Sequence, residues 1–227
     1  PCEQIDMMTK QPSKNYLFTF SCIAAASSVR TGPDEKKGVQ RIGVLKADID
    51  DLGLIFSEGL ENDLTISRYL TMSRMIDLFF SGWVYRILKE SFNNIHTVYS
   101  GGDDLVLVGP WEEIIRFSVT LNTEFGRFTC NNPNITLSAG IAVVSPKHPI
   151  AAAIQMADNA LQVSKAGGKN RVTLFGTAVP WDRMESLLGY GKALENALLD
   201  ENSYVTTGML YRLLHYHEMQ QRVEKMI

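Results

Sequence analysis

The chain has 227 residues, with 22 Lys and Arg against 25 Asp and Glu, so its formal net charge is −3. This length accommodates one or two domains, and a composition of 45% hydrophobic and 21% charged residues argues against wholesale disorder. The near balance of charge excludes a protein that grips nucleic acid mainly by its own basic surface. It leaves room for action on a nucleotide, or for a place in a complex whose other subunits hold RNA.

Compartment and processing follow from a few residues. Cys2, Cys22 and Cys130 form no CxxC pair, so we expect no disulfide framework and a reducing, cytoplasmic location. No run of about 18 uncharged apolar residues occurs, so no membrane span is predicted. Because the chain starts at Pro1, we expect a processed product or a piece of a longer protein.

The N-terminal third contains a loop, a strand and a helix. Residues 16–23 predict a strand or the end of a preceding element, and the Gly, Pro and charged residues of 28–40 predict a linker. The apolar run 41–47 predicts a buried strand. Apolar residues at helical spacing predict one helix over 64–89.

Two strand-like runs, 95–99 and 105–108, flank the sequence Ser-Gly-Gly-Asp-Asp and predict a β-hairpin. Beyond it we expect, in chain order, a helix, a strand, a helix and a strand that closes the sheet: 111–128, 135–144, 149–165 and 171–175.

This order predicts an α+β fold, a ferredoxin-like palm with an antiparallel sheet over residues 41–176. Residues 1–40 are assigned to an N-terminal linker and strand segment. Residues 180–199 and 205–226 show helical patterns without a strand signal, and we expect the start of a C-terminal helical domain over 177–227.

Acidic residues gather at one end of the predicted sheet. Asp48 ends the first strand, while Asp103 and Asp104 lie on the hairpin. In a split βαβ fold the first strand pairs with the third, so these carboxylates can meet. Converging carboxylates repel one another unless a cation lies between them, and oxygen ligands suit Mg²⁺ or Mn²⁺. Gly101 and Gly102 leave space for a close approach.

A cationic segment follows the last predicted helix. Lys165, Lys169 and Arg171 surround two glycines and can neutralise a polyphosphate. Acidic and cationic features together predict a site for a nucleoside triphosphate and two metal ions.

Each feature also has a plainer interpretation. The Gly-Gly-Asp-Asp sequence is compatible with a simple hairpin turn, and the cations with a solvated helix end. Asp50 fits a metal neighbour or a helix cap, and Ser100 fits a base or ribose contact or a cap of the turn. His96 is expected to be structural, and His148, together with His215 and His217, to lie on the surface.

The segments Lys46–Gly53, Tyr99–Asp104 and Ala157–Arg171 resemble a nucleotide-cyclase palm. The similarity is to GGDEF diguanylate cyclases and, more closely, to the Csm-type large signature subunit of type III CRISPR effector complexes. The hairpin motif ends in Asp-Asp rather than Glu-Phe, and residues 66–80 resemble a helix of that subunit. Residues 175–182 resemble the passage into its helical domain.

The resemblance implies an enzyme of antiviral defence that joins ATP into cyclic oligoadenylates. Asp48, Asp103 and Asp104 are implied as catalytic and metal-binding residues, with the Ile49 carbonyl as a further metal ligand. Nucleotide contacts are implied at these positions: Leu52, Gly53, Ser100, Gly101, Gly102, Lys165, Lys169 and Arg171. The implied partners are the other subunits of the ribonucleoprotein complex and, through it, guide and target RNA, with no membrane.

Two departures limit this expectation. The His-Asp motif of the family's nuclease domain is missing, and so is the first palm that completes a two-ATP pocket. We therefore expect weak or no synthesis by this chain alone. A diguanylate cyclase-like enzyme using GTP and a catalytically silent nucleotide-binding scaffold are the alternatives.

Overall fold

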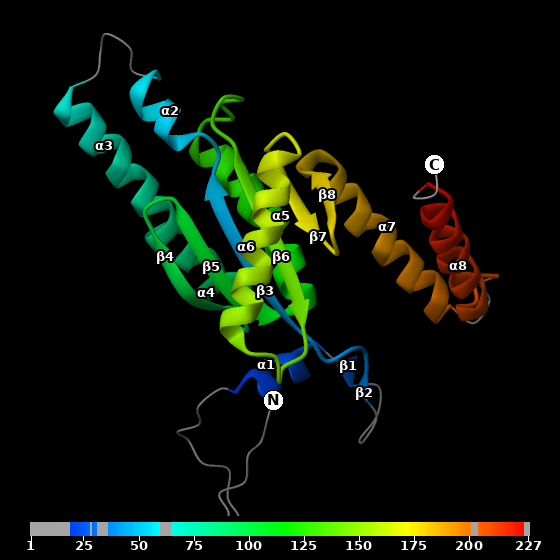
Figure 1. Cartoon of the computed structure of the whole chain (residues 1–227). Helices are drawn as coiled ribbons and strands as arrows, with labels where there is room; N and C mark the ends of the chain where they lie inside the picture. Colours follow the sequence, from blue (N-terminus) through cyan, green and yellow to red (C-terminus); the bar gives the residue numbers. More distant parts are fainter. Residues whose placement is uncertain (1–18, 28, 31–35, 60–64, 201–203, 225–227) are drawn as a thin grey trace, which may run out of the picture. The chain divides into compact units, whose positions relative to one another are not determined.

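The computed structural model describes residues 19–27, 29–30, 36–59, 65–200 and 204–224 (Figure 1). Much of the predicted N-terminal linker, residues 1–18, 28 and 31–35, lies outside this range. The chain divides into two compact units, with the boundary between Trp181 and Asp182.

The helices and strands of the first unit, in chain order, are α1 (Phe20–Ala26), β1 (Val29–Arg30), β2 (Lys36–Lys37), β3 (Ile42–Ile49), α2 (Leu52–Ser57), α3 (Ile66–Asp77), the π-helical segment η2 (Leu78–Trp83), α4 (Val84–Ser91), β4 (His96–Gly101), β5 (Asp104–Pro110), α5 (Trp111–Phe128), β6 (Leu137–Val144), α6 (Ile150–Ala166), β7 (Arg171–Leu174) and β8 (Thr177–Pro180). The helix α7 (Trp181–Leu199) begins at the boundary and is followed by α8 (Thr207–Glu224).

Six strands form one sheet in the order β4-β5-β3-β6-β7-β8. The predicted α+β class is confirmed, and so is the pairing of the first palm strand, β3, with the third, β5. The prediction of an antiparallel sheet is wrong for one pair, because β6 and β7 run parallel. The reason is α6, which crosses from the end of β6 back to the start of β7 and so gives both strands the same direction.

The sheet also extends one strand further than predicted. Residues 171–175 do not close it, because β8 pairs antiparallel with β7. Residues 177–180, which we expected to begin a helical region, are therefore an edge strand. The helical pattern is correct only from Trp181, where α7 begins.

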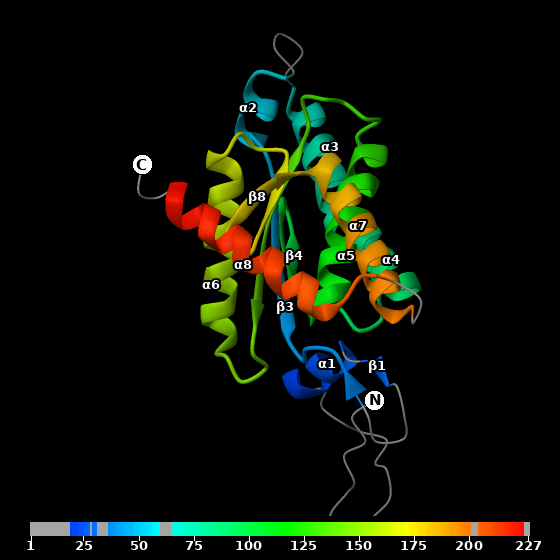
Figure 2. The same cartoon turned by 90° about the vertical axis from the view of Figure 1, so that its right-hand side faces the viewer.

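Helices cover both faces of the sheet, as the nearly edge-on view in Figure 2 shows. Alternate residues of β3 point to opposite faces. Ile42 and Val44 join one hydrophobic cluster with Ala153 and Ala157 of α6, and with Ile23 of α1. Further along this same face of β3, toward its carboxyl end, the apolar residues give way to Lys46 and Asp48.

Two predicted elements differ from what the residues form. The single helix predicted over 64–89 is interrupted by the wider turns of η2, and part of its start lies outside the described residues. The strand alternative for 16–23 is wrong from Phe20 onward, where α1 begins. Thr19 caps α1 by accepting a hydrogen bond from the Cys22 amide, which favours the helix.

The second unit consists of the rest of α7 and α8, both helical as predicted from residue patterns. Within the described part of the chain, no helix combines the length and the apolar character that a membrane span requires.

Candidate nucleotide and metal site

Strand register brings the predicted acidic residues together. Asp48 on β3 lies directly opposite Asp104, the first residue of β5. Paired residues of adjacent strands point to the same face, so both carboxylates lie on the face that α6 covers. One oxygen of each, Asp48 Oδ1 and Asp104 Oδ1, is buried and has no hydrogen-bond partner.

Burial controls the protonation of both carboxyls. Loss of solvent raises the pKa of Asp48 above its ordinary value, although the Lys165 ammonium opposes this shift and the Asp103 charge adds to it. Burial likewise raises the pKa of Asp104, against the lowering effect of Lys46. Each carboxylate therefore lacks enough compensating positive charge in its surroundings.

Two lysines contact these carboxylates. Lys165, near the end of α6, donates a hydrogen bond from Nζ to Asp48 Oδ2. Lys46 lies two residues before Asp48 on β3, and its Nζ is 2.8 Å from Asp158 Oδ1 and 3.8 Å from Asp104 Oδ2. The bond to Asp158 is the main cause that raises the pKa of Lys46. Lys46 and Asp158 were not among the predicted site residues.

The predicted hairpin is confirmed, with Gly101 pairing Asp104 across a two-residue turn. Gly102, the first turn residue, has φ +61°, and no heavy atom lies within 4 Å of the position a Cβ would take there. A positive φ at this place is typical of a type II′ turn and favours glycine. The turn leaves Asp103 outside the ladder of strand pairs.

Ser100 and Gly102 are tied to the preceding helical region. The Ser100 hydroxyl donates to the Phe80 carbonyl at 2.8 Å, and the Gly102 amide donates to Asp77 Oδ1 at 3.3 Å. The Ser100 proton is thus used within the chain, and a contact of Ser100 with a base or ribose stays a prediction.

The cationic segment forms the loop between α6 and β7. Lys169 reaches both oxygens of Asp51 at 2.6 Å, and Arg171 Nε donates to the Lys169 carbonyl at 2.9 Å. Lys169 has φ +61° and Gly168 has φ +115°, so the loop is tightly wound. Leu52 and Gly53 form the first turn of the short helix α2, directly after Asp51.

Asp50 is neither a helix cap nor exposed: it retains 3% of its accessible surface. Its Oδ2 accepts hydrogen bonds from the Thr136 hydroxyl at 2.8 Å and from the Asn170 amide at 3.0 Å. Asp50 therefore fastens the cationic loop to the carboxyl end of β3. The sequence signal for this role is the second aspartate of Asp48-Ile49-Asp50 at the end of the strand, since the next residue, Asp51, occupies the N-cap position of α2.

The residues fit a hard divalent cation, although as the side chains stand no group of three or more His, Cys, Asp or Glu in the described ranges is arranged to hold one. Mg²⁺ commonly takes only one or two carboxylates and completes its shell with water and substrate phosphate. The facing carboxylates of Asp48 and Asp104 each have a buried oxygen without a partner and supply that number, and Asp50 Oδ1 is a further buried oxygen without a partner. Ile49, whose carbonyl is the further predicted ligand, ends β3 next to Asp48.

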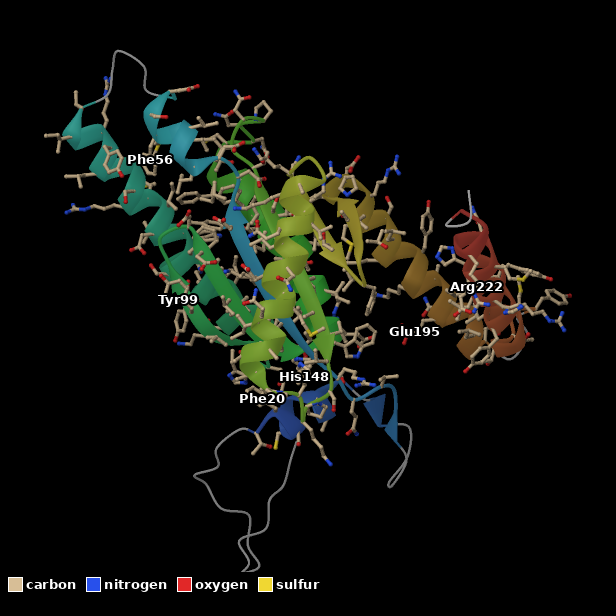
Figure 3. All side chains as sticks on the ribbon, in the orientation of Figure 1. Phe20, Phe56, Tyr99, His148, Glu195 and Arg222 are labelled. Atoms are coloured by element: carbon tan, nitrogen blue, oxygen red, sulfur yellow. The ribbon has the colours of Figure 1, made fainter. Side chains whose placement is uncertain are left out.

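Other candidates lie elsewhere. His148 follows β6 near Val144, which pairs with the first residue of β3, so it lies at the opposite end of the sheet from Asp48. Figure 3 labels His148 at the same end of the molecule in that view as Phe20. The prediction that His148 lies on the surface is wrong, because the residue is half-buried and its Nε2 is buried without a hydrogen-bond partner. His215 and His217 on α8 are exposed, as predicted.

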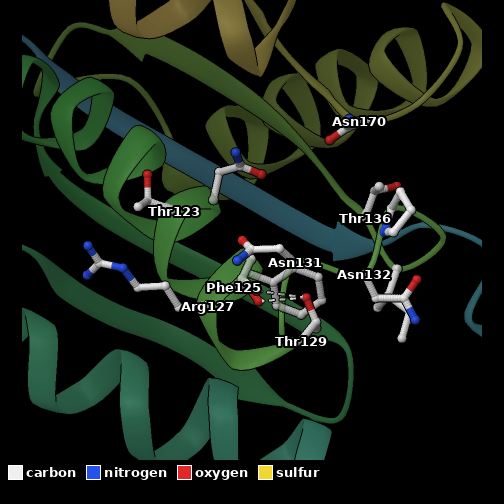
Figure 4. A pocket seen from close by; sticks show the side chains of 12 residues that line it. Thr123, Phe125, Arg127, Thr129, Asn131, Asn132, Thr136 and Asn170 are labelled. Atoms are coloured by element: carbon white, nitrogen blue, oxygen red, sulfur yellow. Dashed lines mark hydrogen bonds between the residues drawn. The ribbon is translucent and has the colours of Figure 1, made fainter.

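A pocket of about 400 Å³ lies at the end of α5 (Figure 4). Asparagine and threonine side chains dominate its lining, and Thr136 and Asn170, the two partners of Asp50, belong to it. Arg127 is the charged residue of this lining. The pocket therefore adjoins the cationic loop but contains none of the predicted site residues.

The chain resembles proteins of one family. The family described as Cas10/Cmr2, second palm domain, matches residues 41–173. A relative from Methanocaldococcus jannaschii, named CRISPR system single-strand-specific deoxyribonuclease Cas10/Csm1 (subtype III-A), is 39% identical in an alignment of 171 residues that covers 65% of this chain and 21% of that protein. The chain thus spans about a fifth of the relative's length.

Solved structures give the same answer. A Csm1–Csm4 cassette in complex with cA4 superposes with a TM-score of 0.74 at 26% identity, over 89% of this chain and 31% of that one. A Csm1–Csm4 cassette in complex with AMPPNP gives 0.70 at 26% identity, with the same coverage. Residues 41–173, which the family model matches, include Asp48, the hairpin and the loop between α6 and β7. The chain belongs to the Cas10/Cmr2 second palm domain family.

Proposed function

We propose that this chain is the nucleotidyltransferase palm of a type III CRISPR effector subunit and that it joins ATP into cyclic oligoadenylates. The observation that carries the proposal is the pair Asp48–Asp104, two facing carboxylates with buried oxygens that have no hydrogen-bond partner. The loop between α6 and β7, whose cationic side chains can bind phosphate, lies beside this pair. Support comes from the relatives, since solved structures similar to this chain hold cA4 and AMPPNP.

In this proposal Asp48 and Asp104, with Asp103 and the Ile49 carbonyl, hold Mg²⁺ or Mn²⁺. Bound there, divalent cations neutralise charge that develops on the phosphoryl oxygens. Lys165 and Lys169 exchange their aspartate partners for phosphate oxygens, and Arg171 contacts the same triphosphate. The backbone of Leu52 and Gly53, and that of Gly101 and Gly102, borders the nucleotide.

The reaction forms one bond and breaks one. A ribose hydroxyl oxygen of one ATP attacks the α-phosphorus of another, the bond from that phosphorus to the β-bridging oxygen breaks, and pyrophosphate leaves. The hydroxyl proton passes to solvent. The residues of this chain orient the triphosphate for in-line attack, and a second nucleotide has to be presented by another domain or subunit. We therefore propose that the other subunits of the complex, with guide and target RNA, are needed for synthesis.

The test uses the full-length subunit in its effector complex with target RNA. Labelled ATP and GTP are supplied separately, and products are resolved chromatographically. We expect cyclic adenylates from ATP, their loss in the double variant Asp103→Ala, Asp104→Ala, and no loss in Glu112→Ala, a change at an exposed carboxylate on α5.

Other outcomes identify the alternatives. Product from GTP alone would contradict the adenylate proposal and indicate a diguanylate cyclase-like enzyme. Tight ATP binding without product under any RNA condition would indicate a nucleotide-binding scaffold.

A further inference from the structure

Two phenylalanine side chains anchor the π-helical segment η2 in the core. Phe79 and Phe80 retain 0% and 1% of their accessible surface. The Phe79 ring lies 5.2 Å from that of Phe125 and 5.0 Å from that of Phe128, both on α5. The Val84 amide donates to the Phe79 carbonyl, five residues back, which is the π pattern. Such wider turns interrupt the regular hydrogen bonding of the α-helix and occur frequently at functional sites.

The last residue of α3 and the segment η2 each accept one hydrogen bond from the Gly-Gly-Asp-Asp hairpin, and the two donors flank Gly101. The Phe80 carbonyl accepts from the Ser100 hydroxyl, and the Asp77 carboxylate accepts from the Gly102 amide. Asp77 is the last residue of α3, so both acceptors lie at the place where the helix widens.

The hairpin needs such ties because its register fixes only part of the site. Asp104 is held opposite Asp48 by the strand ladder, whereas Asp103 lies in the turn, beyond the last pair. Two consecutive glycines precede Asp103, and glycine has more backbone freedom than any other residue. The position of Asp103 therefore depends on what holds Ser100 and Gly102.

We infer that Asp77 and Ser100 are positioning residues that fix the turn carrying Asp103 against η2. The inference rests on the proposed function for its kinetic consequence. Neither residue has to touch the nucleotide for this role, because Ser100 acts through the Phe80 carbonyl and Asp77 through the Gly102 amide.

Two pairs of variants test the inference in the full-length subunit, assembled in its complex with target RNA. Asp77→Ala and Ser100→Ala remove the hydrogen-bonding groups, while Asp77→Asn and Ser100→Thr retain an acceptor oxygen and a hydroxyl. We expect each alanine variant to lower kcat about tenfold with KM for ATP unchanged, since small misplacements of reacting groups have effects of this size or larger. The conservative variants should recover most of the rate.

Ser81→Ala is the matched control. Its hydroxyl donates to the Asp77 carbonyl at 2.6 Å, within the same helical region, and it makes no hydrogen bond to the hairpin among the described contacts. We expect wild-type kcat for this variant. If its rate falls as far as that of Ser100→Ala, the loss reflects the helix rather than the hairpin, and the inference fails.

Hydrogen exchange separates this inference from the proposed function. Amides of the peptide covering residues 98–105 should exchange faster in Asp77→Ala and Ser100→Ala than in wild type or Ser81→Ala. A wild-type complex that makes no product from ATP would refute the proposed function while the exchange result still decides the positioning role. Unchanged exchange and unchanged kcat in both alanine variants would overturn the inference.

Discussion

Gly140 on β6 is a position where the backbone of α6 packs closely against the sheet. A Cβ built there would lie 2.2 Å from the Ala157 carbonyl oxygen and 2.2 Å from the Leu161 amide nitrogen. Ordinary van der Waals contact begins near 3.4 Å, so in Gly140→Ala the helix has to move by about 1 Å. Both neighbours are backbone atoms, and no side-chain rotation can relieve the overlap.

The displacement has a calculable cost. Overpacking of a close-packed core costs about 1–3 kcal/mol, and we expect the upper value because the helix is also fastened by Ser164, whose buried hydroxyl donates to the Ala139 carbonyl at 2.7 Å. For a protein of this size about 3 kcal/mol lowers Tm by roughly 6–12 °C. The melt of Gly140→Ala, followed by circular dichroism, measures this loss.

Gly126→Ala on α5 is the matched control for Gly140→Ala. Its Cβ would meet only Asn131 Oδ1, at 3.2 Å, and this flexible side-chain end can give way. Because Ala is a better helix former than Gly by about 1 kcal/mol, we expect a Tm at or slightly above that of wild type. A Gly140→Ala protein that melts within about 2 °C of wild type, less than 1 kcal/mol on this scale, would refute the close-approach reasoning.

Three further predictions concern the site. Asp50→Ala removes the buried acceptor of the Asn170 amide and should lower the free energy of unfolding by about 1–3 kcal/mol, measured by urea denaturation; an unchanged midpoint would show that water replaces the carboxylate. Mn²⁺ at a hundred times its Kd should stabilise the folded chain by about 2.7 kcal/mol and thereby raise Tm. This rise should be absent in Asp48→Ala, and equal rises in the two proteins would place the metal elsewhere. Burial raises the folded-state pKa of Asp104, so the native state binds more protons than the unfolded chain and metal-free stability falls as pH rises through that pKa. Asp104→Asn should therefore be more stable than wild type at neutral pH, because Lys46 keeps its second carboxylate partner, and this advantage should vanish at pH values below the ordinary carboxyl pKa; a pH-independent difference would contradict the assignment.

Strong local signals accounted for most of the predicted fold. The hairpin was predicted because two β-rich runs flank a glycine-rich turn, and β3 because its apolar run is short and bounded. The strand β8 was missed because Phe175 stands in its turn where Asn or Asp usually precedes the glycine: Phe175 has φ +51° and Gly176 has φ +79°, and a bulky residue such as Phe is rare at positive φ. Tertiary pairing with β7 imposes this conformation, and residue pattern alone does not reveal it.

The π-helical segment escaped prediction for a related reason. A short π-helical segment adds only about one residue to the helix at that point. The apolar residues therefore keep nearly the same spacing, and the pattern over residues 64–89 still predicts a single helix. What decides the widening is the packing of Phe79 and Phe80 against α5, which comes more than 40 residues later. Its consequence, the pair of ties to the hairpin, was therefore invisible at the level of sequence.

For the site, the sequence predicts the carboxylates but not their partners. Asp48 and Asp104 follow from strand order, since adjacent strands of a known topology bring their ends together. The partners of the lysines lie more than a hundred residues away along the chain and depend on the exact seating of α6 on β3 and β6. The resulting pairs are Lys46 with Asp158, Lys165 with Asp48 and Lys169 with Asp51.

Under the proposed function, these pairings explain how a chain of net charge −3 can present cations to a nucleotide. The three lysines and Arg171 are outnumbered by the five aspartates Asp48, Asp51, Asp103, Asp104 and Asp158, so without added cations the acidic side of the proposed site repels a triphosphate. Partly exposed ion pairs contribute only about 0–1 kcal/mol each, so exchanging an aspartate for a phosphate oxygen has a small cost. A divalent cation that takes the carboxylates both removes the repulsion and frees the ammonium groups. Under the proposed function, metal and triphosphate thus need one another at these residues, which a permanently basic surface would not require.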